Sequence, residues 1–210
     1  DGIRDSVASR GLGDVYKRQI ISNSYTDVFT AFSSTIFHTV SIVTTSGFTT
    51  ENFSLWPGFL PYLLLVGAFM GACSQSVGGG IKAWRVLIMI NQAYKEILKT
   101  IHPNAVLTSK IGTKVIDAKI AEKVWGFFSI YVFIFMFLLM AMLGTGLSFE
   151  TAFSAVGACL NNLGPGLGDV ANNYTNVNGF GKFILCFAMI LGRLEIFTLL
   201  VLFTPAFWRR

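Results

Sequence analysis

Two short polar strips interrupt this hydrophobic chain, and both offer oxygen atoms that could bind a cation. The first strip, "VTTSGFTT" at residues 43–50, carries four threonines, a serine and a glycine, and the second strip is "NNLGPGLG" at residues 161–168. Backbone carbonyls can replace the water around a monovalent cation, and glycine permits the backbone angles that turn carbonyls inward. Neither strip contains a carboxylate, which argues against a filter for divalent cations.

A single strip of this kind is more often an ordinary turn than an ion site. The two strips share the same setting, however, because each lies between a short apolar stretch and a longer one. This repeated setting favours the ion-binding interpretation and directs attention to the elements that must position the strips.

These elements have the composition of a membrane protein. Hydrophobic residues make up 53% of the 210 residues, charged residues make up 13%, and the mean hydropathy is +0.61. Apolar runs at 124–147 and 180–208 are long enough to cross a bilayer as helices, which takes about 20 residues. A third run at 56–73 is interrupted by "SQSVGGG" and then resumes as "IKAWRVLIMI", which predicts one crossing with a break in its inner half.

Two shorter apolar stretches, at 26–43 and 148–160, end in the two strips. Both are rather short for independent spans, so we expect re-entrant segments in which a half-helix enters the membrane and the chain returns as a loop. Irregular backbone at membrane depth is tolerated only where protein buries it or where it lines water. The predicted fold class is therefore an all-α integral membrane protein built from span, re-entrant pore loop and span.

The chain repeats this order once. Gly47 aligns with Gly164, 117 positions later, and Thr44–Thr45 then align with Asn161–Asn162. Residues 124–210 read as a complete unit, 20–90 as a unit without its first span, and 91–123 as the linker between them. Residues 1–19 are rich in charge and have no apolar period, so we expect a non-native leader there.

Basic residues predict the orientation of the chain. Lys82, Arg85 and six lysines of the linker fall on one predicted side, together with the C-terminal arginines, whereas the other side carries mainly acids. The residues concerned are Lys95, Lys99, Lys110, Lys114, Lys119, Lys123, Arg209 and Arg210 against Asp27, Glu51, Glu150 and Asp169. We therefore expect a cytoplasmic loop at 91–123, a cytoplasmic C-terminus and an acidic outer vestibule. The basic loop could instead mark a protein or lipid contact.

Four segments carry a family resemblance: "SIVTTSGFTTENFSLWP", "GACSQSVGGGIKAWR", "NNLGPGLG" and "LGRLEIFTLLVLFTPAFWR". Together they resemble the C-terminal part of the Trk/Ktr potassium-transporter family, specifically its bacterial Trk membrane subunits, over residues 20–210. The family has four span, loop and span repeats around one pore. The resemblance implies that this chain holds about one and a half of them and lacks the first two repeats and the outer helix of the third.

The resemblance also assigns roles to residues. It implies a potassium filter, with Thr44, Thr45, Ser46 and Gly47 forming one quarter and Asn161, Asn162, Leu163 and Gly164 another. It implies a gate at the break between 74 and 80, formed by Ser74, Ser76, Gly78, Gly79 and Gly80. A passive kink is the alternative, and the triple glycine does not fit a phosphate loop because Ile81 separates it from Lys82.

The resemblance further implies a homodimer in the bacterial cytoplasmic (inner) membrane, with membrane lipid, the remaining repeats and a ring of cytosolic nucleotide-binding regulatory subunits as partners. Potassium would be the substrate, and no enzyme activity, cofactor or further metal is expected.

Arg193 lies inside the apolar run at 180–208, at a depth where a lone arginine is costly. Its five donors could bond the free carbonyls of an interrupted helix. We therefore expect it to project into the path below the filter and to hold the loop at 74–80 closed.

Two other functions stay open from the sequence. The chain could belong to a secondary transporter that binds a small substrate at a midplane site on broken helices, or it could be a non-conducting membrane fragment. No nucleophile and base constellation or nucleic-acid-binding feature is present. We expect the two strips to lie close together, and His38 to be a packed, neutral side chain.

Overall fold

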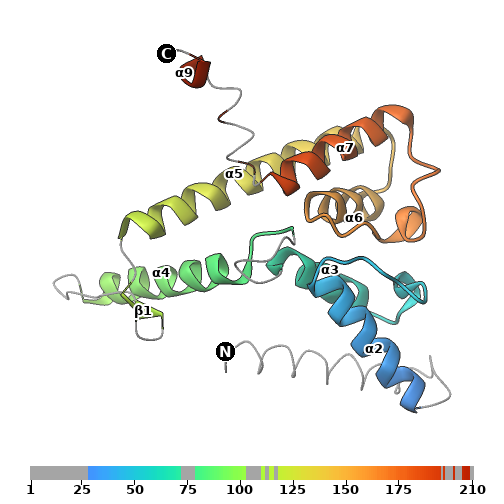
Figure 1. The fold of residues 1–210 in the computed structure, drawn as a ribbon, viewed down its shortest axis with the longest axis horizontal. Helices are drawn as coiled ribbons and strands as arrows, with labels where there is room; N and C mark the ends of the chain where they lie inside the picture. The colour runs from blue at the N-terminus through green and yellow to red at the C-terminus, as the bar shows by residue number, and fades with distance from the viewer. Residues whose placement is uncertain are drawn as a thin grey trace.

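The structure is a computed structural model that describes residues 28–71, 79–102, 110–111, 114–115, 118–194, 196, 201 and 205–208. Within these residues it is helical apart from one short hairpin (Figure 1), which confirms the predicted all-α class. The elements follow in the order α2 (Val28–Val43), η1 (Phe53–Leu55), α3 (Leu60–Met70), α4 (Ala83–Ile101), β1 (Lys110–Ile111), β2 (Lys114–Val115), α5 (Ala118–Leu143), α6 (Phe149–Leu160), η2 (Gly168–Val170), α7 (Gly179–Arg193) and α9 (Pro205–Trp208).

Helix α5 is the one helix in the described ranges that is long and apolar enough to cross a membrane, over Lys119–Leu143. Shorter apolar helices lie at Phe29–Val43, Leu60–Met70 and Phe149–Leu160. After α5 the chain turns within a few residues, because the Gly146 φ of +87° reverses its direction. The Ser148 side chain then caps α6 by accepting a hydrogen bond from the Thr151 N–H at 3.4 Å.

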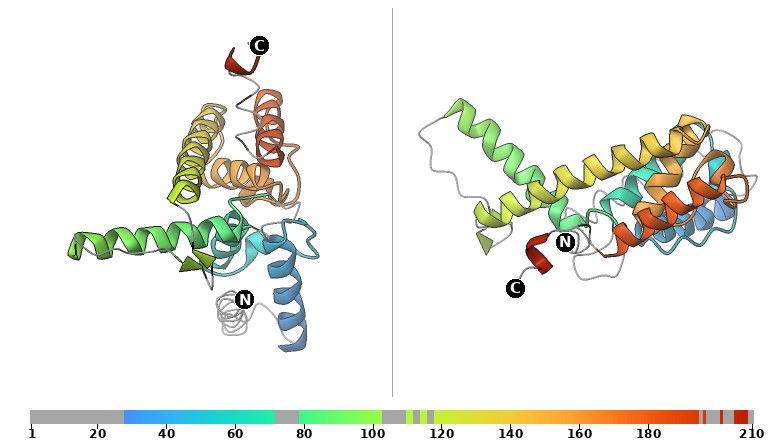
Figure 2. Two further views of the ribbon diagram at one scale, coloured as in Figure 1. Left: turned by 60° about the vertical axis from the view of Figure 1, so that its left-hand side comes forward. Right: turned by 90° about the horizontal axis from the view of Figure 1, so that it is seen from above.

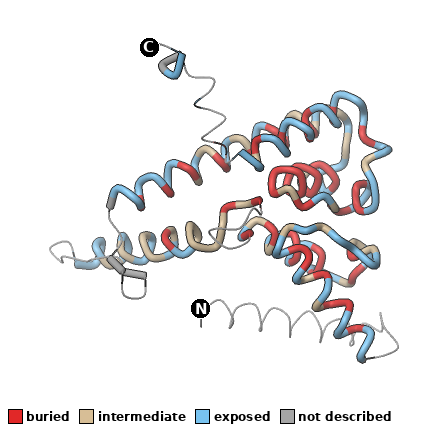
Figure 3. Tube along the Cα trace, viewed as in Figure 1, coloured by how far each residue is buried: buried red, intermediate tan, exposed pale blue. Residues whose placement is uncertain are grey.

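Helix α6 forms the centre of the second half of the chain. Figure 1 and Figure 2 show it beside α5 and α7, and Figure 3 shows it almost wholly buried. Nine of its 12 residues are buried, and most of them are Ala, Gly, Ser, Thr or Cys. Such small residues let neighbouring helices approach closely in a membrane. Phe69 of α3 adds an edge-to-face contact with Phe135 of α5, at 5.5 Å between ring centroids.

A cluster of buried apolar residues joins the first half of the chain, with α2 and α3, to the second half, with α6 and the strip that follows it. Ile42 of α2 and four residues of α3 pack with Ala158, Leu163 and Leu167 from the second half; the α3 residues are Leu60, Leu64, Leu65 and Ala68. The two polar strips lie at the ends of the helices that form this core, so the same packing that joins the halves also brings the strips together.

Helix α4 packs on the first turns of α5 through Ile88, Ala121 and Val124. The Arg85 guanidinium lies 4.1 Å from the centroid of the Phe127 ring, which adds a cation–π contact between the same helices. The hairpin pairs Lys110 with Val115. Helix α4 runs across the boundary predicted at residue 90.

The apolar run at 180–208 does not form one continuous helix in the described residues. Helix α7 ends at Arg193; the Leu194 N–H still bonds the Ile190 carbonyl, but the Ile196 N–H reaches five residues back to Leu191. The predicted break in the earlier run is confirmed in position, because α3 ends at Met70 and α4 begins at Ala83. The apolar helix that follows each polar strip is therefore interrupted.

Candidate ion-binding site

The two polar strips share three backbone hydrogen bonds. In each strip three successive N–H groups donate to carbonyls four, three and five residues earlier, at positions 117 apart. The first strip has one further bond, from the Gly47 N–H to the Ser41 carbonyl at 3.4 Å. The shared bonds are Thr44 to Val40 (2.9 Å), Thr45 to Ile42 (3.1 Å), Ser46 to Ser41 (2.9 Å), Asn161 to Gly157 (3.1 Å), Asn162 to Cys159 (3.1 Å) and Leu163 to Ala158 (2.8 Å). This is the Schellman pattern of helix termination.

The backbone angles repeat as well. Thr45 and Asn162 have φ of +56° and +55°, and Gly47 and Gly164 have φ of +75° and +100°. Asparagine tolerates the left-handed region, but a β-branched residue such as Thr45 rarely adopts it. Strained backbone of this kind persists only where the surroundings hold it, and it concentrates at functional sites.

Most strip carbonyls are left without a donor. Within the described part of the chain, no hydrogen bond is donated to the carbonyls of Thr44–Gly47 or of residues 161–163. The Gly164 carbonyl is different, because the Tyr174 hydroxyl donates to it at 2.5 Å. Backbone carbonyls are normally paired, so two neighbouring rows of unpaired carbonyls are suited to a cation.

The side chains of the first strip are mostly used to fix its own backbone. The Thr44 hydroxyl donates to the Val40 carbonyl at 2.7 Å, and the Ser46 hydroxyl donates to the Ser41 carbonyl at 3.1 Å. The Ser41 hydroxyl in turn donates to the Phe48 carbonyl at 2.7 Å. The hydroxyls therefore shape the strip, and the carbonyls remain as its available ligands.

The side-chain amides of the second strip also bond to neighbouring helices. Asn161 is fully buried, and its Oδ1 accepts a hydrogen bond of 2.8 Å from the Tyr131 hydroxyl of α5. Its Nδ2 has no partner among the described residues. The Asn162 amide reaches α7. With its oxygen and nitrogen assigned in the orientation that gives both a partner, the nitrogen donates to the Met189 carbonyl at 3.3 Å and the oxygen accepts from the Arg193 N–H at 3.1 Å. Both amides are thus turned toward helices.

The strips touch one another, as expected from the repeat. A Cβ on Gly47 would lie 2.0 Å from the Leu163 carbonyl oxygen and 3.2 Å from Pro165 Cδ. Only glycine fits this close approach, since any side chain at position 47 would overlap the backbone of the second strip. The requirement for Gly47 therefore comes from both its left-handed φ and its contact.

The expected gate residues are only partly visible. Ser74, Ser76 and Gly78 lie outside the described residues, whereas Gly79 and Gly80 lie directly against the strips. The Gly79 N–H donates to the Thr45 hydroxyl at 3.3 Å, and a Cβ on Gly79 would lie 1.9 Å from the Asn161 carbonyl oxygen. Arg193 lies in the last turn of α7 with an exposed side chain, and its backbone adjoins Asn162.

Tyr174 and Tyr62 make polar contacts that were not predicted from the sequence. Tyr174 lies in the loop after the second strip, and burial and the nearby Cys159 thiol raise its pKa well above the usual range, so its hydroxyl keeps its proton and donates. The Tyr62 hydroxyl donates to Glu150 at 2.9 Å. A tyrosine beside an apolar run is the only sequence signal for such roles.

His38 is buried against Trp56, with ring centroids 5.2 Å apart, and its Nδ1 lies 2.9 Å from the Ser34 carbonyl. The expected packed histidine is confirmed in placement. Among the described residues no cluster of three or more His, Cys, Asp or Glu could hold a metal ion.

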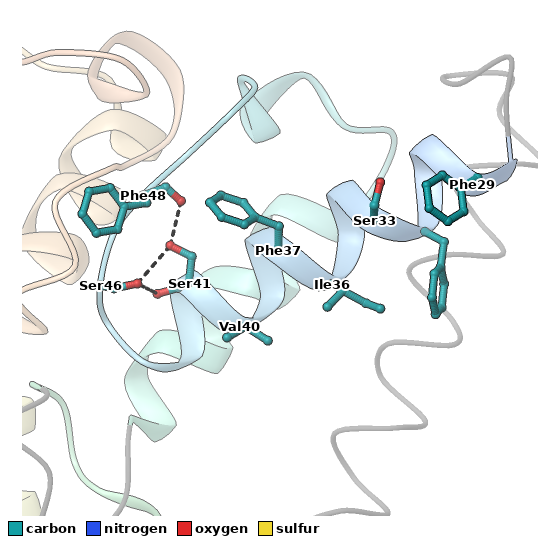
Figure 4. A pocket seen from close by; sticks show the side chains of 9 residues that line it. Phe29, Ser33, Ile36, Phe37, Val40, Ser41, Ser46 and Phe48 are labelled. Carbon is teal, nitrogen blue, oxygen red and sulfur yellow. Dashed lines mark hydrogen bonds between the residues drawn. The ribbon is translucent and has the colours of Figure 1, made fainter.

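The exposed face of α2 forms an apolar groove of about 520 Å³ that ends at the first strip (Figure 4). It is lined by Phe29, Phe32, Ser33, Ile36, Phe37, Val40, Ser41, Ser46 and Phe48. Position 40 corresponds by the repeat to Gly157, which is buried against Phe69 of α3. The same helix face is therefore covered in the second half and open in the first.

Comparison with known proteins places these features in a family. The family model described as "TrkH: Cation transport protein" matches residues 20–210. The chain is 51% identical over 175 residues to the Trk system potassium uptake protein TrkH of Halomonas elongata, covering 83% of this chain and 36% of that protein. It is 49% identical over 187 residues to the protein of the same name from Vibrio parahaemolyticus, covering 89% and 39%.

The fold is also similar to a solved structure. The crystal structure of the potassium transporter TrkH from Vibrio parahaemolyticus superposes with a TM-score of 0.89 and 45% sequence identity, covering 96% of this chain and 43% of that chain. The chain thus spans about two fifths of the length of the curated relatives it matches.

Proposed function

The chain belongs to the TrkH family of cation transport proteins, and from this membership we propose that it forms part of a membrane subunit that takes up potassium. The observation that carries the proposal is the pair of contacting strips with repeated backbone geometry and unpaired carbonyls. In this proposal Thr44, Thr45, Ser46 and Gly47 form one quarter of a filter, and Asn161, Asn162, Leu163 and Gly164 form another.

The filter works through its backbone. A potassium ion that leaves its water needs several oxygens at once, and carbonyl dipoles supply them without a counter-ion. The side chains of the strips hold these carbonyls in place through their bonds to α2, α5 and α7. Glu51, Glu150 and Asp169 lie in the proposed outer vestibule, where their negative potential raises the local concentration of cations.

The interruption between α3 and α4 forms the gate in this proposal, with Ser74, Ser76, Gly78, Gly79 and Gly80. Support comes from its described end, because Gly79 and Gly80 pack against the strips. Arg193 contributes a fixed positive charge at the inner end of α7, which repels cations waiting below the filter. A guanidinium with five donors can also hold an interrupted backbone closed.

The proposed topology places the loop at 91–123 and the C-terminus in the cytoplasm and the strips toward the outside. Residues 20–90 form the end of a third repeat, 124–210 a complete fourth repeat, and 1–19 a non-native leader. The intact subunit would be a homodimer in the bacterial inner membrane, surrounded by lipid and regulated by cytosolic nucleotide-binding subunits. It catalyses no chemical reaction and needs no cofactor besides its substrate, potassium.

The test uses an intact subunit, made by joining residues 20–210 of this chain to the upstream part of the Vibrio parahaemolyticus relative. We expect this protein to restore growth at low potassium in a bacterial strain without potassium uptake, and to take up rubidium in preference to sodium. If the protein reaches the membrane in normal amounts but supports no potassium or rubidium uptake, the proposed function is wrong.

A further inference from the structure

In both halves of the chain, the left-handed residue of the strip bonds to the place where the next helix is interrupted. In the first half, the Thr45 hydroxyl accepts a hydrogen bond from the Gly79 N–H at the interruption between α3 and α4. In the second half, the Asn162 amide bonds the Met189 carbonyl and the Arg193 N–H at the end of α7. These residues occupy equivalent positions, 117 apart, with φ of +56° and +55°.

We propose that Thr45 and Asn162 are positioning residues that connect the filter to the helix interruptions. The inference rests on the proposed function, and it assigns to these side chains a role other than binding the ion. Because each side chain bonds a neighbouring element, a displacement of Gly79 or of the end of α7 would shift the strip that is bonded to it.

The residue types suit this role. Where a helix is interrupted, backbone groups lose their partners, and in a membrane these groups must find new ones within the protein. An asparagine amide has both a donor and an acceptor, so Asn162 can satisfy a carbonyl and an N–H four residues apart. Both groups lie at the C-terminal end of α7, just before the interruption. A threonine hydroxyl suffices for Thr45, because it receives one N–H.

Close backbone contacts at two glycines hold the neighbouring helices against the end of α6. A Cβ on Gly79 would lie 1.9 Å from the Asn161 carbonyl oxygen, and a Cβ on Gly192 would lie 1.9 Å from the Leu160 carbonyl oxygen. The backbone at each interruption is therefore in direct contact with the end of α6. Gly79 contacts both strips, since it bonds Thr45 of the first and touches Asn161 of the second. Gly79 and Gly192 therefore cannot move closer to the end of α6 without displacing it.

The test at position 45 separates the hydrogen bond from the shape of the side chain. Thr45→Val keeps the β-branched shape but loses the acceptor, whereas Thr45→Ser keeps the acceptor. In the intact subunit we expect Thr45→Val to lower the ratio of rubidium to sodium uptake about two- to tenfold, the range that corresponds to one lost hydrogen bond. Thr45→Ser should restore most of the ratio. Equal ratios in the two variants would overturn the role of Thr45.

Asn162→Gly provides the second test, because glycine adopts a positive φ without strain and removes only the amide. If Asn162 served only the backbone turn, this variant would keep its selectivity and its melting temperature. We expect instead a fall of about two- to tenfold in the uptake ratio. Loss of rubidium uptake by the unmodified subunit would count against the proposed function; normal selectivity in Thr45→Val and Asn162→Gly would count against the connection alone.

Discussion

Replacement of Gly47 by alanine tests the filter geometry most directly. The residue has a φ of +75°, and a Cβ there would lie 2.0 Å from the Leu163 carbonyl oxygen, where ordinary contacts begin at 3.4 Å. The strips would have to separate by about 1.4 Å, the difference between these two distances. The left-handed backbone adds a cost of about 1–2 kcal/mol for any residue with a Cβ.

The separation displaces the Leu163 carbonyl, which is one of the proposed ligands. If it loses an interaction comparable with a hydrogen bond to a charged group, about 1.5–3 kcal/mol, selectivity for potassium falls roughly 10- to 100-fold. We therefore expect Gly47→Ala to take up sodium nearly as readily as rubidium. The assay is uptake of rubidium in competition with sodium by cells that contain the intact subunit.

Gly58→Ala is the matched control. Gly58 has a φ of +68°, close to that of Gly47, but no heavy atom lies within 4 Å of the position of its Cβ. This variant carries the backbone strain without the clash, so it should lower the melting temperature of the subunit and leave the uptake ratio unchanged. If Gly47→Ala were as selective as Gly58→Ala, contact between the strips would not set the filter geometry, and the reasoning would fail.

Three further changes test other parts of the structure. Tyr131→Phe removes the donor to a buried asparagine and should destabilise the subunit by about 1–3 kcal/mol; thermal unfolding in detergent measures this, and Tyr94→Phe, at an exposed site, should have no such effect. Arg193→Ala should raise basal rubidium flux and weaken its dependence on the regulatory subunit, and wild-type flux and regulation would leave Arg193 a structural role only. Lys110→Cys should resist a membrane-impermeant thiol reagent added outside the cell, whereas Asn173→Cys should react; ready labelling at position 110 would reverse the topology.

The sequence predicted the helices that carry the site because their apolar runs are long and their ends are marked. The polar strips end α2 at Val43 and α6 at Leu160, where the structure also ends these helices. The offset of 117 was visible from a few aligned residues, and the hydrogen bonds repeat at that offset. The two strips share few identical residues, because their side chains differ whereas their backbone angles and hydrogen bonds are alike.

The interruption of the last helix was not predictable from hydropathy. Residues 180–208 are apolar on both sides of Arg193, and an apolar run contains no sign of a partner elsewhere in the chain. The groups that meet α7 there, the Asn162 amide and the Leu160 carbonyl, are about 30 residues away in sequence. The charged residues of 91–101 likewise suggested a loop. In the structure they continue helix α4, which packs on α5 through Ile88 and ends at Ile101.

The burial of α6 also restricts the order in which the chain can be inserted during synthesis. Its 12 residues span about 18 Å as a helix, well short of the roughly 30 Å of hydrocarbon, and the strip that follows cannot face lipid. Helix α7 packs against α6, and the ribosome makes α7 later. In a nascent chain that has reached only residue 178, α6 therefore lacks its contacts with α7. The second strip can take its final shape only after Gly192, which contacts Leu160 and Asn162, has left the ribosome. The last turn of α7 thus sets the time during biogenesis at which the proposed filter can first form.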